Sequence, residues 1–294
     1  MSLGSFVMNC VRRPRYLPRR LTWAIHQYLP ERPLTMATRL GQMTFSSRDL
    51  VIGRLLCLRE DYGSETLDLA MTILRGERPA ATRGILLDVG ANVGTVCVPL
   101  LLRHPFGHAL VFEPDPYNLA LLERNVDQNG LRHRVEIHRT ALSSANGEAE
   151  LFLSPVNYGD HRLNMRDDGS GAAGRRRVIV RTRRLDDVLT DRNFPPAAVG
   201  LVWMDVQAHE PAVLRGATSL LAARVPLIME FWPSGLRPAG EDPRAMLGLL
   251  AAHYSAWYDL AEPGAAGRSV EELGSVLDRL DRHGGRGWAD LLLL

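Results

Sequence analysis

The chain is predicted to be an α/β protein in which a mostly parallel sheet is covered by helices on both faces. Short apolar runs of strand length recur from residue 85 onwards, and stretches with apolar residues at helical spacing separate them. Strands that alternate with helices favour parallel pairing, because each crossover helix returns the chain to the same end of the sheet. A chain of 294 residues can bury one such domain together with an accessory segment.

The alternation begins over residues 85–112. Residues 85–87 form a short apolar run that ends at Asp88 and a glycine turn, which is typical of a buried parallel strand. Residues 95–102 are apolar enough for a helix, and residues 109–112 supply a second buried strand. These segments predict a strand–helix–strand unit.

The later elements continue the same pattern. Asp115 and Pro116 are the residue types of a helix N-cap and a first helical position, so a crossover helix is expected after the second strand. Three further strands, with a helical stretch between the last two, are predicted at residues 135–138, 201–204 and 226–229.

Residues 143–190 depart from this rhythm. Residues 148–153 and 178–182 have strand composition and enclose a glycine-rich loop. We interpret this stretch as an inserted β-hairpin that folds over the ligand-binding edge of the sheet.

The first 45 residues differ from the rest of the chain. Prolines and scattered apolar residues accompany a run of arginines, namely Arg12, Arg13, Arg15, Arg19 and Arg20. We interpret residues 1–45 as a basic accessory arm and residues 46–294 as the main domain. A solvated helix packed on that domain is the favoured interpretation of the arm, and weak contact with an anionic membrane surface or a partner is the alternative.

Composition excludes several classes of protein. The net charge of +2 is too small to indicate nucleic-acid binding, although all 35 basic residues are arginines. No run of 18 apolar residues could cross a bilayer, and no secretion signal is recognised. Cys10, Cys57 and Cys97 form neither a Cys-x-x-Cys motif nor an evident disulfide framework, so a cytoplasmic location is expected.

Ligands of an open parallel sheet bind beyond the carboxyl ends of its strands. Glu113 follows the second strand and stands 25 residues after Asp88, a distance typical of a carboxylate that accepts hydrogen bonds from both hydroxyls of a ribose. Gly90 and Gly94 would let the backbone turn tightly and approach a ligand closely. The predicted cofactor-binding residues are Asp88, Gly90, Ala91, Asn92, Gly94, Glu113, Pro114, Ala141 and Leu142.

A glycine turn after a strand serves several cofactors. A dinucleotide pyrophosphate favours Gly-x-Gly-x-x-Gly before a helix, and that pattern is absent from residues 88–94. S-adenosylmethionine carries no phosphate, and its sulfonium and zwitterionic methionine end tolerate the nearby Asp88. The charges therefore favour S-adenosylmethionine as the cofactor and disfavour a nicotinamide oxidoreductase.

Taken jointly, the motifs resemble those of the FkbM-type methyltransferases. The matching segments are residues 87–94, Phe112-Glu113-Pro114 and residues 204–217, and the resemblance covers roughly residues 48 to 232. It implies a Rossmann-like class I methyltransferase fold with a seven-stranded, mostly parallel sheet. It also implies S-adenosylmethionine as methyl donor and, usually, a hydroxyl acceptor on a glycan or small-molecule natural product.

Three positions depart from the family pattern. Trp203 stands where a lysine is common, Gln207 where the family has glutamate, and Ala208 where it has glycine. These departures keep an alternative open, in which the chain binds the cofactor but is a catalytically inactive scaffold or partner protein.

Methyl transfer to a hydroxyl requires alignment of the acceptor oxygen and a group that takes its proton. Asp205, which ends a strand beside the cofactor turn, is one candidate base, and its alternative role is to cap the next helix. His209 titrates near neutrality, but it is equally well explained as a solvated loop histidine. His161 is the third candidate.

Polar residues near these candidates are predicted to hold the acceptor. They are Asn157, Asp160, Arg162, Gln207, Glu210 and Glu230. Residues 157–162 are equally well explained as a surface loop of ordinary turn formers, and Glu210 as a helix cap. Asp205 and Glu230 could bind a divalent cation, but no tight ligand spacing is present, so no metal is predicted.

Overall fold

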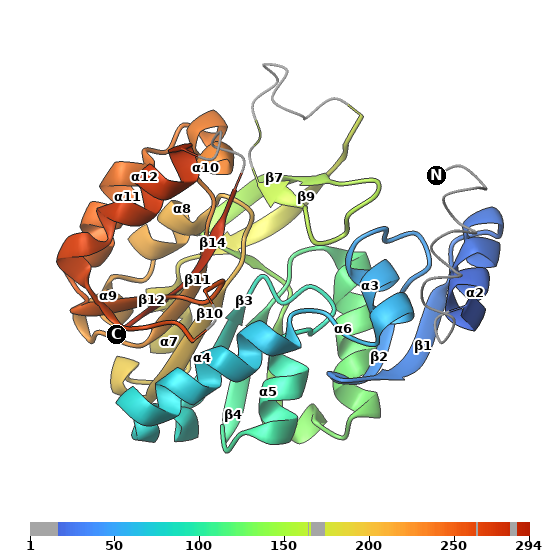
Figure 1. The fold of residues 1–294 in the computed structure, drawn as a ribbon, viewed down its shortest axis with the longest axis horizontal. Helices are drawn as coiled ribbons and strands as arrows, with labels where there is room; N and C mark the ends of the chain where they lie inside the picture. The colour runs from blue at the N-terminus through green and yellow to red at the C-terminus, as the bar shows by residue number, and fades with distance from the viewer. Residues whose placement is uncertain (1–16, 164, 166–173, 263, 283–286) are drawn as a thin grey trace.

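The computed structural model describes residues 17–163, 165, 174–262, 264–282 and 287–294. A central sheet of eight strands has the order β13-β12-β14-β11-β10-β3-β4-β5 (Figure 1). Its parallel part consists of β3 (Ile85–Val89), β4 (His108–Phe112), β5 (Val135–His138), β10 (Val199–Met204) and β11 (Leu227–Phe231). All six residues of β10 are buried, as expected for a strand covered on both faces.

The predicted α/β class is confirmed, whereas the strand count differs from the expected seven. The additional antiparallel strands are β12 (Ala256–Asp259), β13 (Arg268–Ser269) and β14 (Ala289–Leu293). The chain inserts β14 between β11 and β12, and the two-residue β13 then forms one edge of the sheet. The eighth strand is thus a short edge addition to a mostly parallel core.

Helices pack on both faces of this sheet and enclose two apolar cores. One face is covered by α3 (Ile52–Arg59), α4 (Ser64–Glu77), α5 (Cys97–Arg103) and α6 (Pro116–Gln128). The other is covered by α7 (Leu185–Asp191), α8 (Glu210–Arg215), α9 (Thr218–Ala222), α10 (Pro233–Ala239), α11 (Pro243–Ala251) and α12 (Gly274–Arg282). Within the described residues, no helix is both long and apolar enough to span a membrane.

Local sequence explains where two of these helical segments begin and end. Asp115 caps α6 by accepting hydrogen bonds from the backbone amides of Tyr117 and Asn118, and Pro116 occupies the first helical position, as predicted. The helical stretch expected between β10 and β11 is divided into α8 and α9 at Gly216. A Cβ atom on Gly216 would lie 2.1 Å from the carbonyl oxygen of Ser143, so this position packs against another backbone segment.

The predicted inserted hairpin is present. β7 (Gly147–Leu153) pairs antiparallel with β9 (Arg176–Arg183), and β6 (Ala141–Leu142) and β8 (Arg162–Leu163) extend the pair into a four-stranded sheet. Part of the glycine-rich loop between the predicted strands lies outside the described residues.

The described part of the N-terminal arm packs against the main domain. It contains α2 (Leu17–Tyr28) and a hairpin of β1 (Pro33–Thr38) and β2 (Gly41–Ser46). Thr44 exchanges hydrogen bonds with the Asn125 amide on α6, at 2.6 and 2.9 Å, and Phe45 is buried in the core beneath α6. Arg12, Arg13 and Arg15 lie outside the described residues, and the division at residue 45 stays a prediction.

Candidate active site

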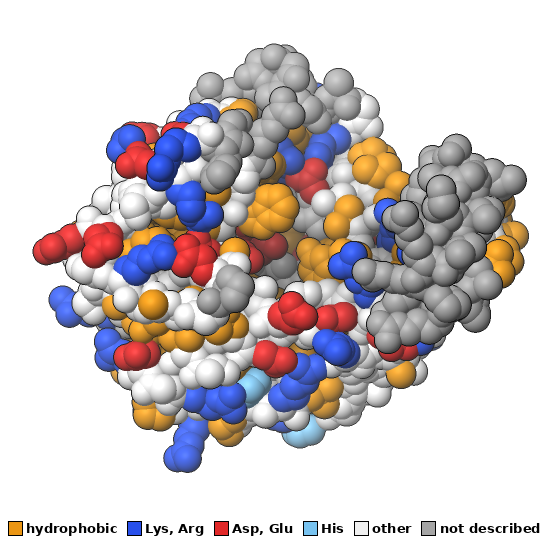
Figure 2. Space-filling view, viewed as in Figure 1, with side chains coloured by type: hydrophobic (Ala, Val, Ile, Leu, Met, Phe, Trp, Pro, Cys, Tyr) orange, Lys and Arg blue, Asp and Glu red, His pale blue; other side chains and the backbone are white. Residues whose placement is uncertain are grey.

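A cavity of about 1380 Å³ opens at the carboxyl ends of β3, β4, β10 and β11. Figure 2 shows this face of the molecule hollowed near its middle, where acidic and hydrophobic side chains lie next to one another. The volume exceeds that of most single-ligand pockets, so the cavity can hold a nucleoside-sized cofactor and a second molecule. We call the part beside β3 and β4 the donor end and the part beside β10 and β11 the acceptor end.

The donor end contains most of the predicted cofactor residues. They are Asp88, Gly90, Asn92, Glu113, Pro114, Ala141 and Leu142. Asp88 is buried, and its Oδ2 accepts a hydrogen bond of 2.9 Å from the backbone amide of Cys97. Burial, with a smaller contribution from the charge of Asp205, raises the pKa of Asp88 to about 7. The structure therefore fixes this carboxyl group in place before any ligand binds.

Glu113 is held in the same way. One of its oxygens accepts from the backbone amide of Asn92 and the other from that of Asp115, each at 2.8 Å. Burial raises the pKa of Glu113 to about 8. Each carboxylate oxygen has a further lone pair, so the group can still accept hydrogen bonds from a ligand in the cavity.

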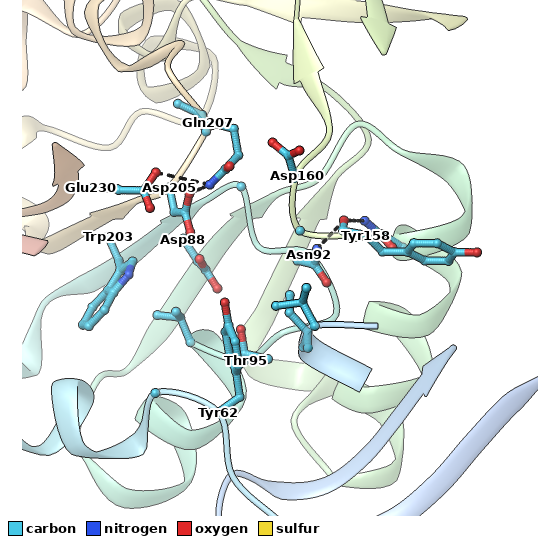
Figure 3. Close-up of a pocket in the computed structure, with 18 of the residues that line it drawn as sticks. Tyr62, Asp88, Asn92, Thr95, Tyr158, Asp160, Trp203, Asp205, Gln207 and Glu230 are labelled. Carbon is cyan, nitrogen blue, oxygen red and sulfur yellow. Dashed lines mark hydrogen bonds between the residues drawn. The ribbon is translucent and has the colours of Figure 1, made fainter. Parts of the chain in front are cut away.

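Asn92 joins the cofactor turn to the inserted region. Its backbone is left-handed, with φ of 52°, a conformation that asparagine tolerates better than most residues. Its side-chain amide donates to the carbonyl oxygen of Tyr158 at 2.8 Å (Figure 3). Asn118 on α6 donates to the same oxygen at 2.9 Å, so the turn and the inserted loop are held in one arrangement.

Two predicted cofactor residues, Ala91 and Gly94, do not line the cavity. Gly94 has φ of +89°, and a Cβ atom there would lie 2.9 Å from Cδ1 of Leu122 on α6. Its role is therefore to turn the chain and pack closely on α6. Gly90 was expected to let the backbone approach a ligand, but the structure gives another reason for a glycine. A Cβ atom added at this position would lie 2.0 Å from the carbonyl oxygen of Asp205. Glycine is needed there for the contact between the β3 turn and the end of β10.

The acceptor end brings together residues from three separate segments of the chain. They are Asn157, Asp160, His161, Arg162, Asp205, Gln207 and Glu230. The Gln207 side-chain amide lies between two carboxylates and donates to Asp205 at 2.6 Å and to Glu230 at 3.3 Å (Figure 3). Burial, followed by the charges of Asp205 and Glu210, raises the pKa of Glu230 to about 10. The protein around the cavity partly desolvates Asp205 and raises its pKa, although the side chain stays open to solvent within the cavity.

The charged groups of the inserted loop are already paired. Arg162 lies 2.5 Å from one oxygen of Asp160, and Arg175 contacts the other. The guanidinium of Arg162 also stacks over Trp232, 4.5 Å from the ring centroid. These contacts hold the side chains of Arg162 and Asp160 in place as part of the cavity wall.

His161 lines the cavity but is poorly placed to take a proton. Its Nδ1 accepts a hydrogen bond of 3.1 Å from the backbone amide of Ser154, which leaves Nε2 to carry the ring proton. Nε2 lies 3.9 Å from Oδ2 of Asp115. Burial lowers the pKa of His161, which disfavours protonation of the ring.

The prediction for His209 requires correction. His209 lies outside the cavity, where its Nε2 is 3.0 Å from the Ser143 hydroxyl, and burial lowers its pKa to about 4. It precedes α8 as the N-cap residue, and its side chain makes no capping hydrogen bond. Glu210 is also absent from the cavity wall, and its Oε1 accepts a 3.0 Å hydrogen bond from the backbone amide of Val206. Neither residue can contact an acceptor directly from this position.

The loop that contains Gln207 and Ala208 has an unusual backbone. Both residues have positive φ, 54° and 74°, which places them in the left-handed region that favours glycine. This explains physically why a glycine suits the position of Ala208. Trp203, the third departure from the family pattern, lies on β10 and forms part of the cavity wall.

The sequence analysis missed several residues of this site. Tyr62 precedes α4 and lines the cavity, and burial raises the pKa of its hydroxyl group. Asp290 lies on β14 directly opposite Glu230 in the antiparallel register. Trp232 and Trp288 also line the cavity. An isolated acidic residue within the apolar C-terminal run could have marked Asp290, whereas nothing in the sequence distinguishes Tyr62.

Comparison with known proteins identifies the family. The methyltransferase FkbM domain matches residues 88–255, which is more than half of the chain. The chain belongs to the FkbM methyltransferase family. The matched region includes both ends of the cavity, and the family implies S-adenosylmethionine as the methyl donor.

Two related proteins each match a little more than half of this chain. A 2-O-methyltransferase, NoeI, from Sinorhizobium fredii is 27% identical over 56% of this chain and 70% of its own length. The hexuronic acid methyltransferase AglP from Haloferax volcanii is 30% identical over 57% of this chain and 61% of its own length. A solved FkbM methyltransferase from Methylobacillus flagellatus is 14% identical, with a TM-score of 0.44. The match covers 72% of this chain and 44% of that one.

Proposed function

We propose that this FkbM-family protein transfers the methyl group of S-adenosylmethionine to a hydroxyl oxygen of a glycan or a small natural product. The main observation behind this proposal is that the donor-end and acceptor-end carboxylates line one cavity. Glu113 would accept hydrogen bonds from the ribose hydroxyls, with Asn92 and Pro114 beside it. Charge-assisted bonds of this kind are each worth roughly 1.5 to 3 kcal/mol, which is enough to select a nucleoside.

The relatives support a hydroxyl acceptor. One is named a 2-O-methyltransferase and another a hexuronic acid methyltransferase. The acceptor end of this chain offers carboxylates and an amide for hydroxyl groups, together with Trp232 and the half-exposed Trp288 as flat apolar surfaces. Polar groups beside aromatic faces suit a polyhydroxylated ring, which has polar edges and apolar C–H faces.

In the proposed reaction the acceptor oxygen attacks the methyl carbon in line with the departing sulfur. The new C–O bond forms as the C–S bond breaks, and the hydroxyl proton must leave the oxygen. Asp205 is proposed to orient this hydroxyl and receive its proton, because it is accessible in the cavity and a raised pKa makes its carboxylate more basic. His209 is excluded from this role by its position, and His161 by its hydrogen bond to Ser154.

The first test is calorimetric titration of the full chain with S-adenosylmethionine. Saturable binding is expected, and Glu113→Ala should abolish it. Absence of binding at millimolar ligand would overturn the proposal. Binding by Glu113→Ala at the affinity of the unmodified chain would remove Glu113 from the cofactor site.

The second test follows labelled methyl groups from S-adenosylmethionine into extracts of the source organism and identifies the product. A methyl ether on a sugar or other hydroxyl compound is expected. Binding of the donor without transfer to any acceptor would instead favour an inactive scaffold, the alternative suggested by Trp203, Gln207 and Ala208.

A further inference from the structure

Three carboxylates converge beside the acceptor end, from positions that are separated along the chain. Asp205 follows β10, Glu210 begins α8 and Glu230 lies on β11. One oxygen from each lies within 4.8 Å of the others. The fold thus places three potential oxygen ligands around a common point at the edge of the cofactor turn.

A fourth carboxyl group, that of Asp290, lies beside this cluster. Asp290 lies directly opposite Glu230 in the antiparallel register of β14 and β11, an arrangement that is unfavourable for two like charges. Among the described residues, no ion pair joins Asp205, Glu210, Glu230 or Asp290 to an arginine or histidine. The neutral amide of Gln207 is the donor that lies between Asp205 and Glu230.

Glu210 provides an independent indication of a ligand. The residue is 1% exposed, and its Oε1 is held by the backbone amide of Val206. Its Oε2 is buried and has no hydrogen-bond partner in the described part of the chain. Buried carboxylate oxygens are almost always satisfied, and a bound ion is one of the few explanations for an exception.

We propose that Asp205, Glu210 and Glu230 bind a hard divalent cation, Mg²⁺ or Mn²⁺, beside the acceptor hydroxyl. Carboxylate oxygens are the ligands these ions prefer, and the remaining coordination positions would be taken by water and the acceptor oxygen. Binding would require these three oxygens, which now lie within 4.8 Å of one another, to move closer together. The Gln207 amide, which now bridges two of the carboxylates, would turn aside or present its own oxygen.

The cation gives the acceptor end a specific chemical task within the proposed methyl transfer, on which this inference rests. A divalent ion that binds the acceptor oxygen lowers the pKa of its hydroxyl and fixes its direction of attack. Asp205 would then hold the ion through one carboxylate oxygen and receive the hydroxyl proton on the other. The sequence-based expectation of no metal rested on the wide ligand spacing, which folding removes.

The test begins with the full chain, treated with EDTA and then freed of it. Mn²⁺ is titrated into this protein, and binding is measured as the loss of the electron paramagnetic resonance signal of free Mn²⁺. One bound equivalent is expected, and Mg²⁺ should displace it. Glu230→Gln should weaken Mn²⁺ binding roughly tenfold or more, since a ligand matters at least as much as the groups that orient ligands. Glu65 is an exposed residue in the first turn of α4, also at the cavity wall, and Glu65→Gln is the matched control, which should bind Mn²⁺ normally.

The outcomes separate this inference from the proposed function. No Mn²⁺ binding at millimolar ion, or equal binding by Glu230→Gln and the unmodified chain, would overturn the cation site. Titration with S-adenosylmethionine in EDTA is read independently, so donor binding without Mn²⁺ binding overturns only the cation. If Glu230→Gln does not fold, Asp205→Asn and the Mg²⁺ competition on the unmodified chain decide the question. Methyl transfer should stop in EDTA and return with Mg²⁺.

Discussion

The donor and acceptor ends of the cavity are built from the same residue type in opposite ways. At the donor end, backbone amides hold both carboxyl groups, that of Cys97 at the start of α5 for Asp88 and those of Asn92 and Asp115 for Glu113. At the acceptor end, Asp205 and Glu230 face each other, and the described residues supply one side-chain amide between them. The donor end is therefore organised before ligand binding, whereas the acceptor end holds close carboxyl groups whose ionisation a bound cation would favour.

This difference indicates what each end can bind. A carboxylate fixed by amides recognises a neutral hydroxyl pair by geometry, because its charge is already partly balanced. A group of close carboxylates without such partners attracts a cation and is costly without one. The contrast yields predictions for each end and for the contact that joins them.

The largest effect is expected at the contact between the two ends. Gly90→Ala would place a Cβ atom 2.0 Å from the Asp205 carbonyl oxygen at a residue with φ of +87°. Left-handed strain costs about 1 to 2 kcal/mol and overpacking typically adds 1 to 3 kcal/mol, so the free energy of unfolding should fall by roughly 2 to 5 kcal/mol. Denaturant unfolding measures this change.

Gly63→Ala is the matched control for that substitution. Gly63 also has a positive φ, +74°, but no atom lies within 4 Å of its would-be Cβ. Gly63→Ala should therefore lower the free energy of unfolding only by the left-handed strain, about 1 to 2 kcal/mol. Equal losses for the two variants would show that the close approach of Gly90 to β10 does not matter.

The next effect separates the two ends by their ligands. Glu113→Gln replaces charge-assisted bonds to the ribose with neutral ones, a loss of about 3 kcal/mol, so the Kd for S-adenosylmethionine should rise roughly 100-fold. Glu230→Gln should leave this Kd within about threefold, because Glu230 lies at the other end of the cavity. Calorimetric titration of both variants with S-adenosylmethionine measures the contrast. A comparable loss of affinity in Glu230→Gln would show that both ends of the cavity contribute to donor binding.

The same contrast explains which parts of the site could be predicted from sequence. Asp88, Asn92 and Glu113 lie in short motifs at the ends of adjacent strands, so local pattern and topology were sufficient to place them. The five parallel strands were also predicted, because each is a short apolar run between turn residues. The acceptor end depends on residues that are distant along the chain, such as Asp290 on β14, and on a pairing register that no local pattern contains.

The misassigned residues have a common physical origin. Gly90 and Gly94 have the expected positive φ, but the sequence could not show that Asp205 and Leu122, rather than a ligand, occupy the space beside them. His209 is a candidate base on its sequence alone because histidine titrates near neutrality and the residue lies in the segment after the fourth predicted strand. The left-handed backbone at Gln207 and Ala208 turns the chain, so a neighbour in sequence lies outside the cavity.

A smaller effect is expected on the pH dependence of stability. Burial raises the folded-state pKa of Glu113 to about 8, and burial with neighbouring carboxylates raises that of Glu230 to about 10, both from 4.5. The folded chain then binds more protons than the unfolded chain, so stability is present below about pH 4.5 and is lost as the pH rises through these folded-state values. In EDTA without cofactor, the unfolding midpoint should therefore fall between about pH 6.5 and 8.5 by a few degrees.

Glu230 at the acceptor end should contribute more to this pH dependence of the unfolding midpoint than Glu113 at the donor end. Glu230→Gln should flatten it more than Glu113→Gln, because the pKa of Glu230 is raised further and lies above the measured range. Thermal unfolding across this pH range provides the measurement. A midpoint that rises with pH would contradict the raised pKa values at both ends.

The smallest effect is expected outside the cavity, at His209. His209→Gln retains a polar side chain near the Ser143 hydroxyl, with which Nε2 is in contact at 3.0 Å, so the stability change should stay near 1 kcal/mol. The rate of methyl transfer at neutral pH should change less than about twofold, because the ring does not reach the acceptor. Burial lowers the pKa of His209 from 6.5 to about 4, so this residue lowers the stability of the folded chain as the pH falls through that range. The His209→Gln variant should lose this part of the acid sensitivity. A fall in the transfer rate of 100-fold or more without loss of stability would return His209 to the catalytic site.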